Sequence, residues 1–262
     1  MQVRPGPAVG IDVGGTTIKA ALVASDRGTL LSERQVAPTP RPATPADVVE
    51  AVGSLVEALA PEPSTPVGVA LPAVVRDGVT CTAANIDPSW IGLEAERALR
   101  EHLGRDVRVI NDADAAGLAE ATHGAARGRS GVVLVTTLGT GIGSCLLVDG
   151  ALVPNTELGH LQIGGRPAER DAATSALHRD GLTYAQWAER LTVYYRALED
   201  LLSPDLFVVG GAVSASAAEF LPHIAVRTPL VAATLGNDAG IIGAARVAAT
   251  ARPLEPAATG LR

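Results

Sequence analysis

Asp112 is the residue of this chain whose sequence surroundings best suit general base chemistry. It lies in the stretch VINDADAAGLAEATHG, residues 109–124, where a predicted strand passes into a predicted helix just after Asn111. Asparagine and aspartate both cap helices well, so a purely structural role would also explain the pair. In an open α/β fold such a junction faces the cleft, where a carboxylate can accept the proton of an attacking hydroxyl. We therefore predict Asp112 as the base, rather than Asp114, which lies further into the helix and points in another direction.

Two glycine-rich turns could hold the phosphoryl group that such a hydroxyl attacks. The first lies in IDVGGTTIKA and the second in LGTGIGS, each after an apolar run that is typical of a strand. Glycine lets backbone N–H groups approach a phosphate without a Cβ in the way, and threonine hydroxyls add donors. Hairpins also use glycine for turn geometry alone, so it is the presence of both turns that indicates a phosphate site. The residues concerned are Gly14, Gly15, Thr16, Gly139, Thr140, Gly141 and Gly143.

Lys19 follows the first turn and is the single lysine among the 21 basic residues of the chain. A lysine is a compact charge on a flexible stem, which suits a phosphate beside a crowded turn. An ordinary exposed strand lysine is the alternative explanation.

Two polar loops carry the amide, carboxylate and imidazole groups that can bind sugar hydroxyls. TAANIDPSWIG, residues 82–92, contains Asn85, and PNTELGHLQIGG, residues 154–165, contains Glu157 and His160. These side chains donate to and accept from hydroxyl groups. We expect them to form a sugar site, although His160 by itself would be explained as a structural histidine.

These residues must be positioned by strands and helices whose pattern occurs twice. In each half, a strand, a turn of glycine and threonine and a second strand are followed by alternating helices and strands. Thr44 and Pro45 fit the N-cap and first position of a helix. The expected strands are 9–13, 17–24, 29–36, 67–71, 107–110, three within 132–153, and 206–209. The expected helices begin at 45 and lie at about 93–103, 183–202 and 239–249, before a frayed tail, ARPLEPAATGLR.

The repeat predicts a duplicated α/β architecture in which both glycine turns face one cleft. This is the arrangement of the actin-like, or ribonuclease H-like, two-domain sugar-kinase folds. We expect a small N-terminal domain over residues 1–112, rejoined by the C-terminal helix at about 239–250, and a larger domain over 113–238. Chance similarity between two hairpins is the alternative.

The composition indicates a globular chain without a nucleic-acid or membrane partner. Of the 262 residues, 47% are hydrophobic and only 3% aromatic, so the cores must be largely aliphatic. The net charge of −7 argues against duplex DNA or an anionic membrane as main partner. No signal peptide is visible, so we expect a cytoplasmic location. Cys81 and Cys145 are expected to be buried, reduced thiols.

Together, these stretches resemble the ROK family of sugar kinases and, within it, the bacterial polyphosphate glucokinases. The matching pieces occur in family order between about residues 9 and 245. They are GIDVGGTTIKAAL, TAANIDPSWIG, NDADAAGLAE, LGTGIGS, PNTELGHLQIGG, SPDLFVVGGAVS and NDAGIIGAA. The resemblance implies a homodimer that transfers a phosphoryl group from inorganic polyphosphate or ATP, with Mg²⁺, to the 6-hydroxyl of glucose.

The same resemblance implies roles for individual residues. Asp112 matches the catalytic base. The glucose contacts match Asn85, Asn111, Glu157, His160 and Glu169. The phosphate and magnesium region matches Asp12, Gly14, Gly15, Thr16, Lys19, Thr140 and Gly141, with Asp12 placing Mg²⁺ through water. The segment that borders the donor matches Gly210, Gly211 and Ser214.

The chain also departs from the family pattern. It has no cysteine after Cys145, so we expect no structural zinc. Ala212 replaces the third glycine of a usual Gly-Gly-Gly. Uncharged residues stand where polyphosphate glucokinases usually carry basic ones, at Pro88, Leu177, Ala215 and Ser216. The choice between polyphosphate, ATP and both therefore stays open.

Three other functions fit the same residues in part. The first is an ATP-dependent ROK kinase of mannose, fructose or an N-acetylhexosamine. The second is a catalytically silent sugar-binding protein, against which Asp112 and both glycine turns argue. The third is an actin-like ATPase or scaffold, which should lack the two polar loops and hydrolyse ATP without sugar.

Overall fold

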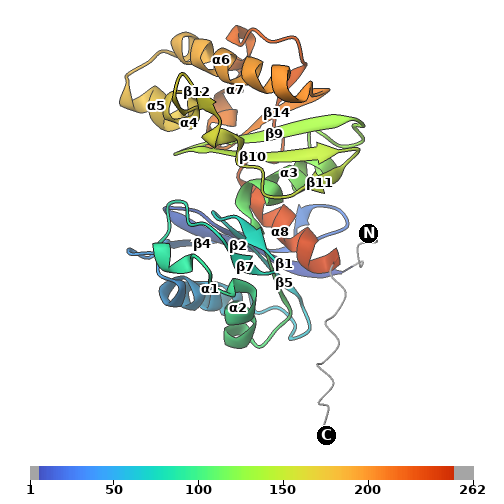
Figure 1. Cartoon of the computed structure of the whole chain (residues 1–262). Coiled ribbons are helices and arrows are strands. Elements are labelled where there is room, and N and C mark those ends of the chain that lie inside the picture. Colours follow the sequence, from blue (N-terminus) through green and yellow to red (C-terminus); the bar gives the residue numbers. More distant parts are fainter. Residues whose placement is uncertain (1–5, 251–262) are drawn as a thin grey trace, which may run out of the picture.

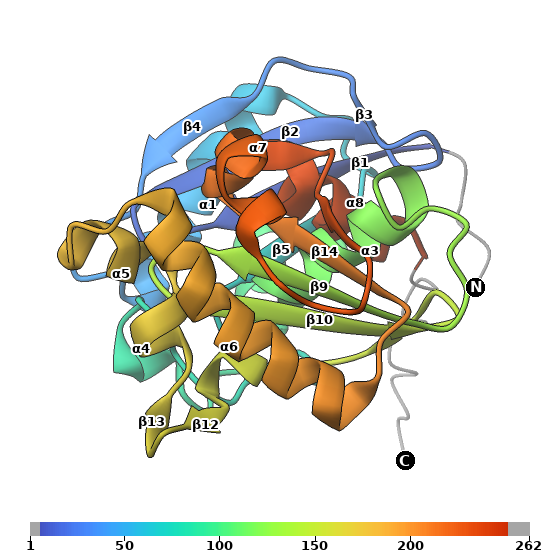
Figure 2. The same cartoon turned by 90° about the horizontal axis from the view of Figure 1, so that it is seen from above.

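Two β-sheets with the same strand order form the framework of the molecule (Figures 1 and 2). The computed structural model describes residues 6–250, so the expected frayed tail lies outside the described residues. In the first sheet, β1 pairs antiparallel with β2 and parallel with β5, which pairs parallel with β8. In the second, β9 pairs antiparallel with β10 and parallel with β14, which pairs parallel with β15. Order and direction both repeat, as the predicted duplication requires.

The strands of the two sheets are short and mostly buried along their centres. The first sheet contains β1 (Pro7–Val13), β2 (Thr17–Ala24), β3 (Thr29–Leu30), β4 (Gln35–Pro38), β5 (Val67–Leu71) and β8 (Val107–Asn111). The second contains β9 (Val132–Leu138), β10 (Ile142–Val148), β11 (Ala151–Val153), β14 (Leu206–Gly210) and β15 (Leu230–Ala232). Two small hairpins lie outside them, β6 (Val75–Arg76) with β7 (Val79–Thr80) and β12 (Gln162–Ile163) with β13 (Arg166–Pro167).

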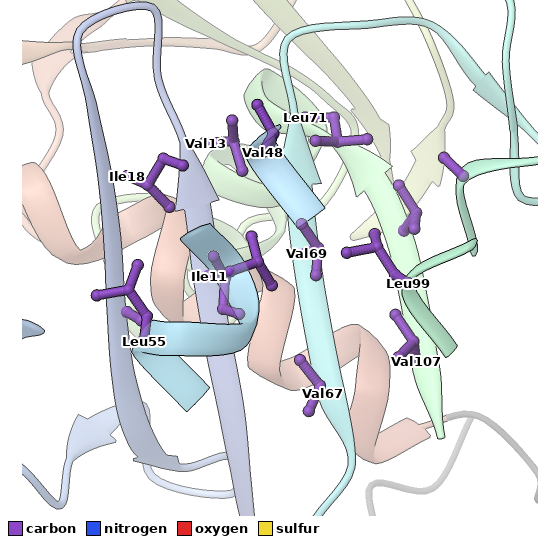
Figure 3. Packing of buried hydrophobic residues seen from close by; sticks show 14 of the residues in the cluster. Ile11, Val13, Ile18, Val48, Leu55, Val67, Val69, Leu71, Leu99 and Val107 are labelled. Carbon is purple, nitrogen blue, oxygen red and sulfur yellow. The ribbon is translucent and has the colours of Figure 1, made fainter. Parts of the chain in front are cut away.

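The first sheet packs against α1 (Pro45–Leu59) and α2 (Ala95–Leu103) through a largely aliphatic core, part of which is shown in Figure 3; Trp90 is its one aromatic residue among those described. The Thr44 hydroxyl accepts from the backbone of Asp47, so α1 begins where the sequence predicted. Ile11, Val69 and Leu99 are fully buried in this core. The residues labelled in the picture are Val, Ile and Leu without exception, as the low aromatic content requires.

The second sheet packs against α6 (Tyr184–Leu202), which lies over this sheet in Figure 2 and shares one core with β9, β10 and β14. Most of the few aromatic side chains of the chain gather here. Trp187 lies 4.9 Å from Phe220 between ring centroids, and Tyr195 lies 4.9 Å from Phe207. The Thr183 hydroxyl and the Gln186 side chain form a capping box that starts the helix.

Helices α3 (Asp112–His123) and α8 (Ala239–Thr250) lie between the two sheets in Figure 1. They pack on each other, and α8 also packs on β1 and β5. Glycine allows this close packing, because a Cβ on Gly243 would lie 1.8 Å from the Ala115 carbonyl oxygen. A Cβ on Gly68 would lie 1.9 Å from the Ala244 carbonyl oxygen. The C-terminal helix therefore contacts the first sheet, whereas the domain division at residue 112 stays a prediction.

Two sequence predictions were wrong in detail. The strand expected over 29–36 is interrupted, because the Ser32 hydroxyl accepts the Leu22 N–H at 3.0 Å in place of a strand carbonyl. Cys81 is exposed, because it follows the end of β7, where the chain leaves the hairpin, whereas Cys145 is buried and both thiols are free.

No helix within residues 6–250 is long and apolar enough to cross a membrane. Short elements complete the described chain. The remaining helices are α4 (Glu169–Ala172), α5 (Thr174–Arg179) and α7 (Ala217–Phe220). The 3-10 turns are η1 (Pro88–Trp90), η2 (Leu158–His160), η3 (Ala212–Ser216), η4 (Leu221–His223) and η5 (Gly236–Asp238).

Candidate active site

Asp12, Lys19 and Asp112 come from three elements and line one cavity of about 220 Å³. Asp12 stands opposite Lys19 in the β1–β2 hairpin, and the Lys19 Nζ lies 3.6 Å from the Asp12 carboxylate. Asp112 is the first residue of α3, directly after β8. Because β1 and β8 both run parallel to β5, their carboxyl ends meet at one edge of the sheet.

The surroundings of Asp112 favour its protonated form. Burial raises the pKa of its carboxyl to about 7, and the negative charges of Asp12 and Glu157 add to the increase. The Ala113 N–H, which donates to Asp112 at 2.8 Å, partly opposes it. A carboxyl with a pKa near neutrality can accept and release a proton under working conditions.

Asp12 has a similar but separate environment. Burial raises the pKa of the Asp12 carboxyl, and Lys19 opposes that increase. A Cβ on Gly240 would lie 2.9 Å from the Asp12 Cγ, so the start of α8 covers this carboxylate with bare backbone. Such a carboxylate beside a phosphate-sized cavity fits Mg²⁺, which keeps several waters and needs one or two carboxylates besides the phosphates. Among residues 6–250, no cluster of three or more His, Cys, Asp or Glu side chains could hold a metal ion by itself.

The first glycine turn lies against the loop that carries Asn85. Gly14 donates its N–H to the Thr17 carbonyl at 3.0 Å, and the Thr39 hydroxyl donates to the Gly14 carbonyl at 2.6 Å. A Cβ on Gly15 would lie 3.2 Å from the Asn85 Cβ, so a side chain there would crowd Asn85. The turn and a predicted sugar residue are therefore neighbours.

The second glycine turn is anchored by α5. Gly139 donates its N–H to the Gly141 carbonyl at 3.0 Å, and the Ser175 hydroxyl donates to the Thr140 carbonyl at 2.7 Å. Thr140 lines a second cavity, of about 540 Å³, together with Gly15, Thr16 and Asn85. The two turns therefore face a common cavity, although they lie more than a hundred residues apart in the chain.

Glu169 joins the second turn to His160. One carboxylate oxygen accepts the Ile142 N–H at 3.1 Å, and the other lies 3.5 Å from the His160 Nε2. A Cβ on Gly141 would lie 2.5 Å from the Glu169 carboxylate, so a larger residue there would displace this carboxylate. Burial raises the pKa of the neighbouring Glu157, His160 opposes that increase, and Glu169 adds to it. The three predicted sugar residues of this region therefore act on one another.

Asn111 is buried and makes two hydrogen bonds within the protein. Its carbonyl oxygen accepts the Asp114 N–H at 3.0 Å, which caps α3, and its amide donates to the Ala73 carbonyl at 3.1 Å. Asp114 is buried and accepts the Asn155 N–H at 2.7 Å. Asp112, and not Asp114, therefore lines the cavity that contains Asp12 and Lys19.

Asn155 was missed at the sequence level. Its side-chain oxygen accepts the Val75 N–H at 2.8 Å, and its side-chain nitrogen donates to the Val75 carbonyl at 2.8 Å. The segment that follows β6 and β7 carries Asn85, and the loop after Asn155 carries Glu157. One amide therefore joins the two loops of the predicted sugar site. Asn155 adopts a positive φ of 59°, which asparagine tolerates better than most residues. The asparagine itself was therefore the only, and weak, signal in the sequence.

Of the three residues predicted to border the donor, two line the cavity and one does not. Gly210 and Gly211 line the cavity with Asp112, and a Cβ on Gly211 would lie 2.2 Å from the Leu138 carbonyl oxygen. Ser214 lies beyond them in η3 and does not line the cavity. Gly143 lies in β10, where a Cβ would be 2.8 Å from the Ala113 Cβ, so its bare backbone lets α3 approach the sheet.

The cavity also contains residues to which the sequence assigned no role. Asn237 and Gly240 belong to the piece NDAGIIGAA, which carried the family resemblance without an assigned contact. Thr137 immediately precedes the piece LGTGIGS. Glu120 holds the loop beside them, because its buried carboxylate accepts the N–H groups of Thr234 at 3.0 Å and Leu235 at 2.8 Å.

Comparisons with known proteins show what the whole chain is similar to. The chain is 46% identical over 237 residues to the polyphosphate glucokinase of Mycobacterium tuberculosis (strain CDC 1551 / Oshkosh), covering 90% of this chain and 89% of that protein. Its fold matches the crystal structure of inorganic polyphosphate/ATP-glucomannokinase from Arthrobacter sp. strain KM with a TM-score of 0.90. That match has 51% identity and covers 93% of this chain and 98% of the other.

A more distant structure shares the fold. The ROK family glucokinase from Streptomyces griseus, solved in complex with glucose and AMPPNP, matches with a TM-score of 0.79 at 24% identity, over 93% of this chain and 99% of that chain. Residues 8–175 of the chain match the ROK family itself. The duplicated sheets, the shared cavity and these comparisons lead to one conclusion: the chain belongs to the ROK family, with its actin-like sugar-kinase fold.

Proposed function

We propose that this chain is a glucokinase that transfers a phosphoryl group from inorganic polyphosphate, ATP or both to the 6-hydroxyl of glucose. The observation that carries the proposal is the position of Asp112, whose carboxyl has a pKa of about 7 and lines one cavity with Asp12 and Lys19. The relatives named polyphosphate glucokinase and polyphosphate/ATP-glucomannokinase support both the acceptor and the donors.

The sugar is held by side chains from both halves of the molecule. Asn85 comes from the loop after β7, and Glu157 and His160 come from the loop after β11. Glu169 orients His160 and the turn at Gly141 through the contacts described above. Asn111, whose amide already makes two protein hydrogen bonds, retains one N–H and one lone pair for a hydroxyl group.

Asp112 accepts the proton of the 6-hydroxyl as that oxygen forms a bond to the terminal phosphorus of the donor. The bond from this phosphorus to the leaving oxygen breaks in line, and the shortened donor keeps the electron pair. The N–H groups of the glycine turns and the Lys19 ammonium stabilise the charge on the transferred group. Asp12 would hold Mg²⁺ through water, and the bound ion would neutralise charge on the donor phosphates.

The donor preference follows from the charge that lines the cavity. Lys19 is the single basic residue among the described residues that line the cavity around Asp112. A polyanion gains affinity with each basic contact, so this cavity by itself should bind polyphosphate only modestly. We expect turnover with both donors. Glucose 6-phosphate formation, measured side by side with polyphosphate and with ATP, tests this.

The outcomes of that experiment separate the candidate functions. Formation of glucose 6-phosphate with either donor supports the proposal. ATP hydrolysis at the same rate with and without sugar would favour an actin-like ATPase instead. Sugar binding without any turnover would favour a silent sugar-binding protein.

Mannose is the second acceptor that a specific observation favours. The relative with 51% identity is named a glucomannokinase. Glucose and mannose differ only in the configuration at the 2-hydroxyl, and a pocket that holds the other hydroxyls discriminates weakly between them. The ratio of kcat/KM for glucose and mannose, with fructose and N-acetylglucosamine as further sugars, measures this range.

The remaining proposals concern organisation. We propose a division into residues 1–112 with the helix at 239–250, and residues 113–238, because each part has its own sheet and core. Closure of the two parts on glucose would exclude water from the phosphoryl group. We also propose that the protein is cytoplasmic and that it forms a homodimer. Sedimentation velocity tests the oligomeric state.

A further inference from the structure

A cavity of about 540 Å³ lies outside the candidate active site and is lined by arginines. Its lining residues come from β12, β13, α4, α5 and α6 and the turns beside them, and Figure 2 shows these elements grouped around α6. Nothing in the proposed reaction uses it. Its charged lining consists of Arg166, Arg170, Arg179, Arg190, Asp171 and Asp180, which we name the arginine pocket.

The arginine pocket carries an excess of positive charge. Arg166 pairs with Asp171 at 2.8 Å, and Asp180 pairs with both Arg179 at 2.8 Å and Arg190 at 2.5 Å. Arg170 has no carboxylate partner within residues 6–250. Four arginines against two aspartates leave two positive charges in a protein whose net charge is −7. The pocket is therefore a local site for an anion on an acidic molecule.

Tyr194 belongs to the wall of the pocket, and its hydroxyl is buried inside the protein without a partner among the described residues. The whole side chain is almost fully buried. Leaving a buried polar group unpaired costs free energy, so such groups in native proteins usually await a water, an ion or a ligand. A phosphate oxygen can accept from several guanidinium groups together, and those of the arginine pocket line the cavity itself.

The helices that carry these arginines also hold the candidate active site. Arg170 follows Glu169 in α4, and the Glu169 carboxylate contacts Ile142 and His160. Arg179 ends α5, whose Ser175 donates to the carbonyl oxygens of Gly139 and Thr140. Arg179 also donates to the Arg170 carbonyl at 2.9 Å, which ties α5 to α4. An anion that bridges α4, α5 and α6 would therefore restrict Glu169 and the second glycine turn.

We propose that the arginine pocket binds a multiply charged phosphate anion and that its occupancy tightens glucose binding. The anion contacts Arg170 first, because this guanidinium has no carboxylate to displace. Its source is either a free phosphate or a distant segment of a polyphosphate chain, and both present the same oxygens. Restricting α4 and α5 before glucose arrives lowers the ordering cost that glucose binding would otherwise meet.

Calorimetric titration with tripolyphosphate tests binding without any turnover, so its failure is distinct from a failure of the proposed function. Wild-type protein should show two classes of site, one in the candidate active site and one in the arginine pocket. Arg170→Gln removes one charge and should weaken the second class about tenfold, and Arg170→Glu should abolish it. Arg129→Gln and Arg129→Glu are matched controls, because Arg129 is exposed and does not line the pocket.

The comparison of these variants decides the matter. Identical titrations of Arg170→Glu and Arg129→Glu would overturn the site, and circular dichroism of both confirms that they fold. Orthophosphate and long-chain polyphosphate are titrated in parallel. An effect of Arg170→Glu on orthophosphate identifies a free anion as ligand, whereas an effect confined to the long chain identifies a segment of the donor.

The coupling to glucose has its own measurement. In wild-type protein, added orthophosphate should lower the apparent Kd for glucose, measured by intrinsic fluorescence or calorimetry without donor, by about twofold or more. Arg170→Glu should remove this response and Arg129→Glu should keep it. An unchanged glucose Kd in wild-type protein at saturating phosphate would refute the coupling.

Discussion

Asp112 has neighbours that help its chemistry and also make its ionisation costly. Asp12 and Glu157 add negative charge beside a carboxyl that is already buried, and the pKa rises to about 7. The same position lets it reach a hydroxyl group in the cavity that it lines with Asp12 and Lys19. The raised pKa therefore has consequences both for activity and for stability.

The first prediction concerns activity at the residue scale. In wild-type protein kcat/KM for glucose should rise about tenfold per pH unit below about pH 7 and then level off, because only the ionised carboxylate accepts a proton. Asp112→Asn should lower kcat by a factor of about 10²–10⁴ and remove the rise of kcat/KM with pH. Asp114→Asn is the matched control and should keep the rise of kcat/KM with pH, since Asp114 does not line the cavity. A rate for Asp112→Asn above a tenth of wild type would contradict the base assignment.

The second prediction concerns stability at the same residue. A carboxyl with a folded-state pKa of about 7 and an ordinary value of 3.8 binds protons more tightly when folded, so its contribution to stability falls as pH rises from about 4 to 7. Asp112→Asn avoids this loss and should raise Tm at pH 8 by about 2 °C or more. The difference in Tm between Asp112→Asn and wild type should be smaller at pH 5 and zero near pH 4. Thermal unfolding followed by circular dichroism measures it. An equal difference at pH 8 and pH 4 would argue against this explanation.

At the scale of elements, loops from the two halves of the sequence must meet accurately to form the sugar site. The β6–β7 hairpin precedes Asn85, the loop after β11 precedes Glu157, and Asn155 joins them through both hydrogen bonds to Val75. Its backbone N–H is in turn fixed by Asp114 at the start of α3. The relative position of the sugar-binding side chains therefore depends on one amide that contacts no reacting atom.

The third prediction tests this positioning role. Asn155→Gly keeps the positive φ available and removes both bonds to Val75, so KM for glucose should rise about three- to tenfold with kcat changed less. Asn155→Ala adds backbone strain at φ 59° and should also lower Tm. Steady-state kinetics over a range of glucose concentrations separates KM from kcat. A fall in kcat with KM unchanged would place Asn155 in the chemical step instead.

At the scale of the whole molecule, α3 and α8 join the two sheets. Their contact depends on bare backbone, because Gly243 leaves no room for a Cβ beside Ala115. The same helices begin at Asp112 and one residue before Gly240, so their packing also sets the distance between Asp112 and Asp12. The helix contacts that hold the two sheets together therefore also position residues of the candidate active site.

The fourth prediction follows from this packing. Gly243→Ala places a methyl group 1.8 Å from a carbonyl oxygen and should destabilise the protein by about 1–3 kcal/mol, as overpacking of a core does. Helix propensity alone favours alanine, so a destabilised variant would identify packing as the cause. Gly6→Ala, where a Cβ would meet nothing within 4 Å, is the control and should leave unfolding unchanged. Urea unfolding measures both; a Gly243→Ala variant as stable as wild type would mean that α3 and α8 can separate without cost.

The local elements were largely predictable because their signals are local. Thr44 with Pro45 marked the start of α1, and the apolar runs at 67–71 and 206–209 marked buried strands. The hairpin repeat at residues 9–24 and 132–148 indicated the duplicated sheets. The predicted strand over 29–36 was wrong because a single hydroxyl, that of Ser32, replaces a backbone acceptor, which no periodicity reveals.

The sequence by itself determined which chemical groups are present and where each stands on its own element. The Asp112 carboxylate follows a strand, Lys19 faces Asp12 across a hairpin, and glycine occupies both turns. Only the tertiary structure decided that Asp12, Lys19 and Asp112 share one cavity and that the two glycine turns share a second. It also decided that Asn155 joins two loops, and that a third cavity is surrounded by Arg166, Arg170, Arg179 and Arg190. The physical reason is that burial and charge coupling depend on distances between segments far apart in the chain. The raised pKa of Asp112 arises from desolvation and from carboxylates at positions 12 and 157, and no local pattern contains that information.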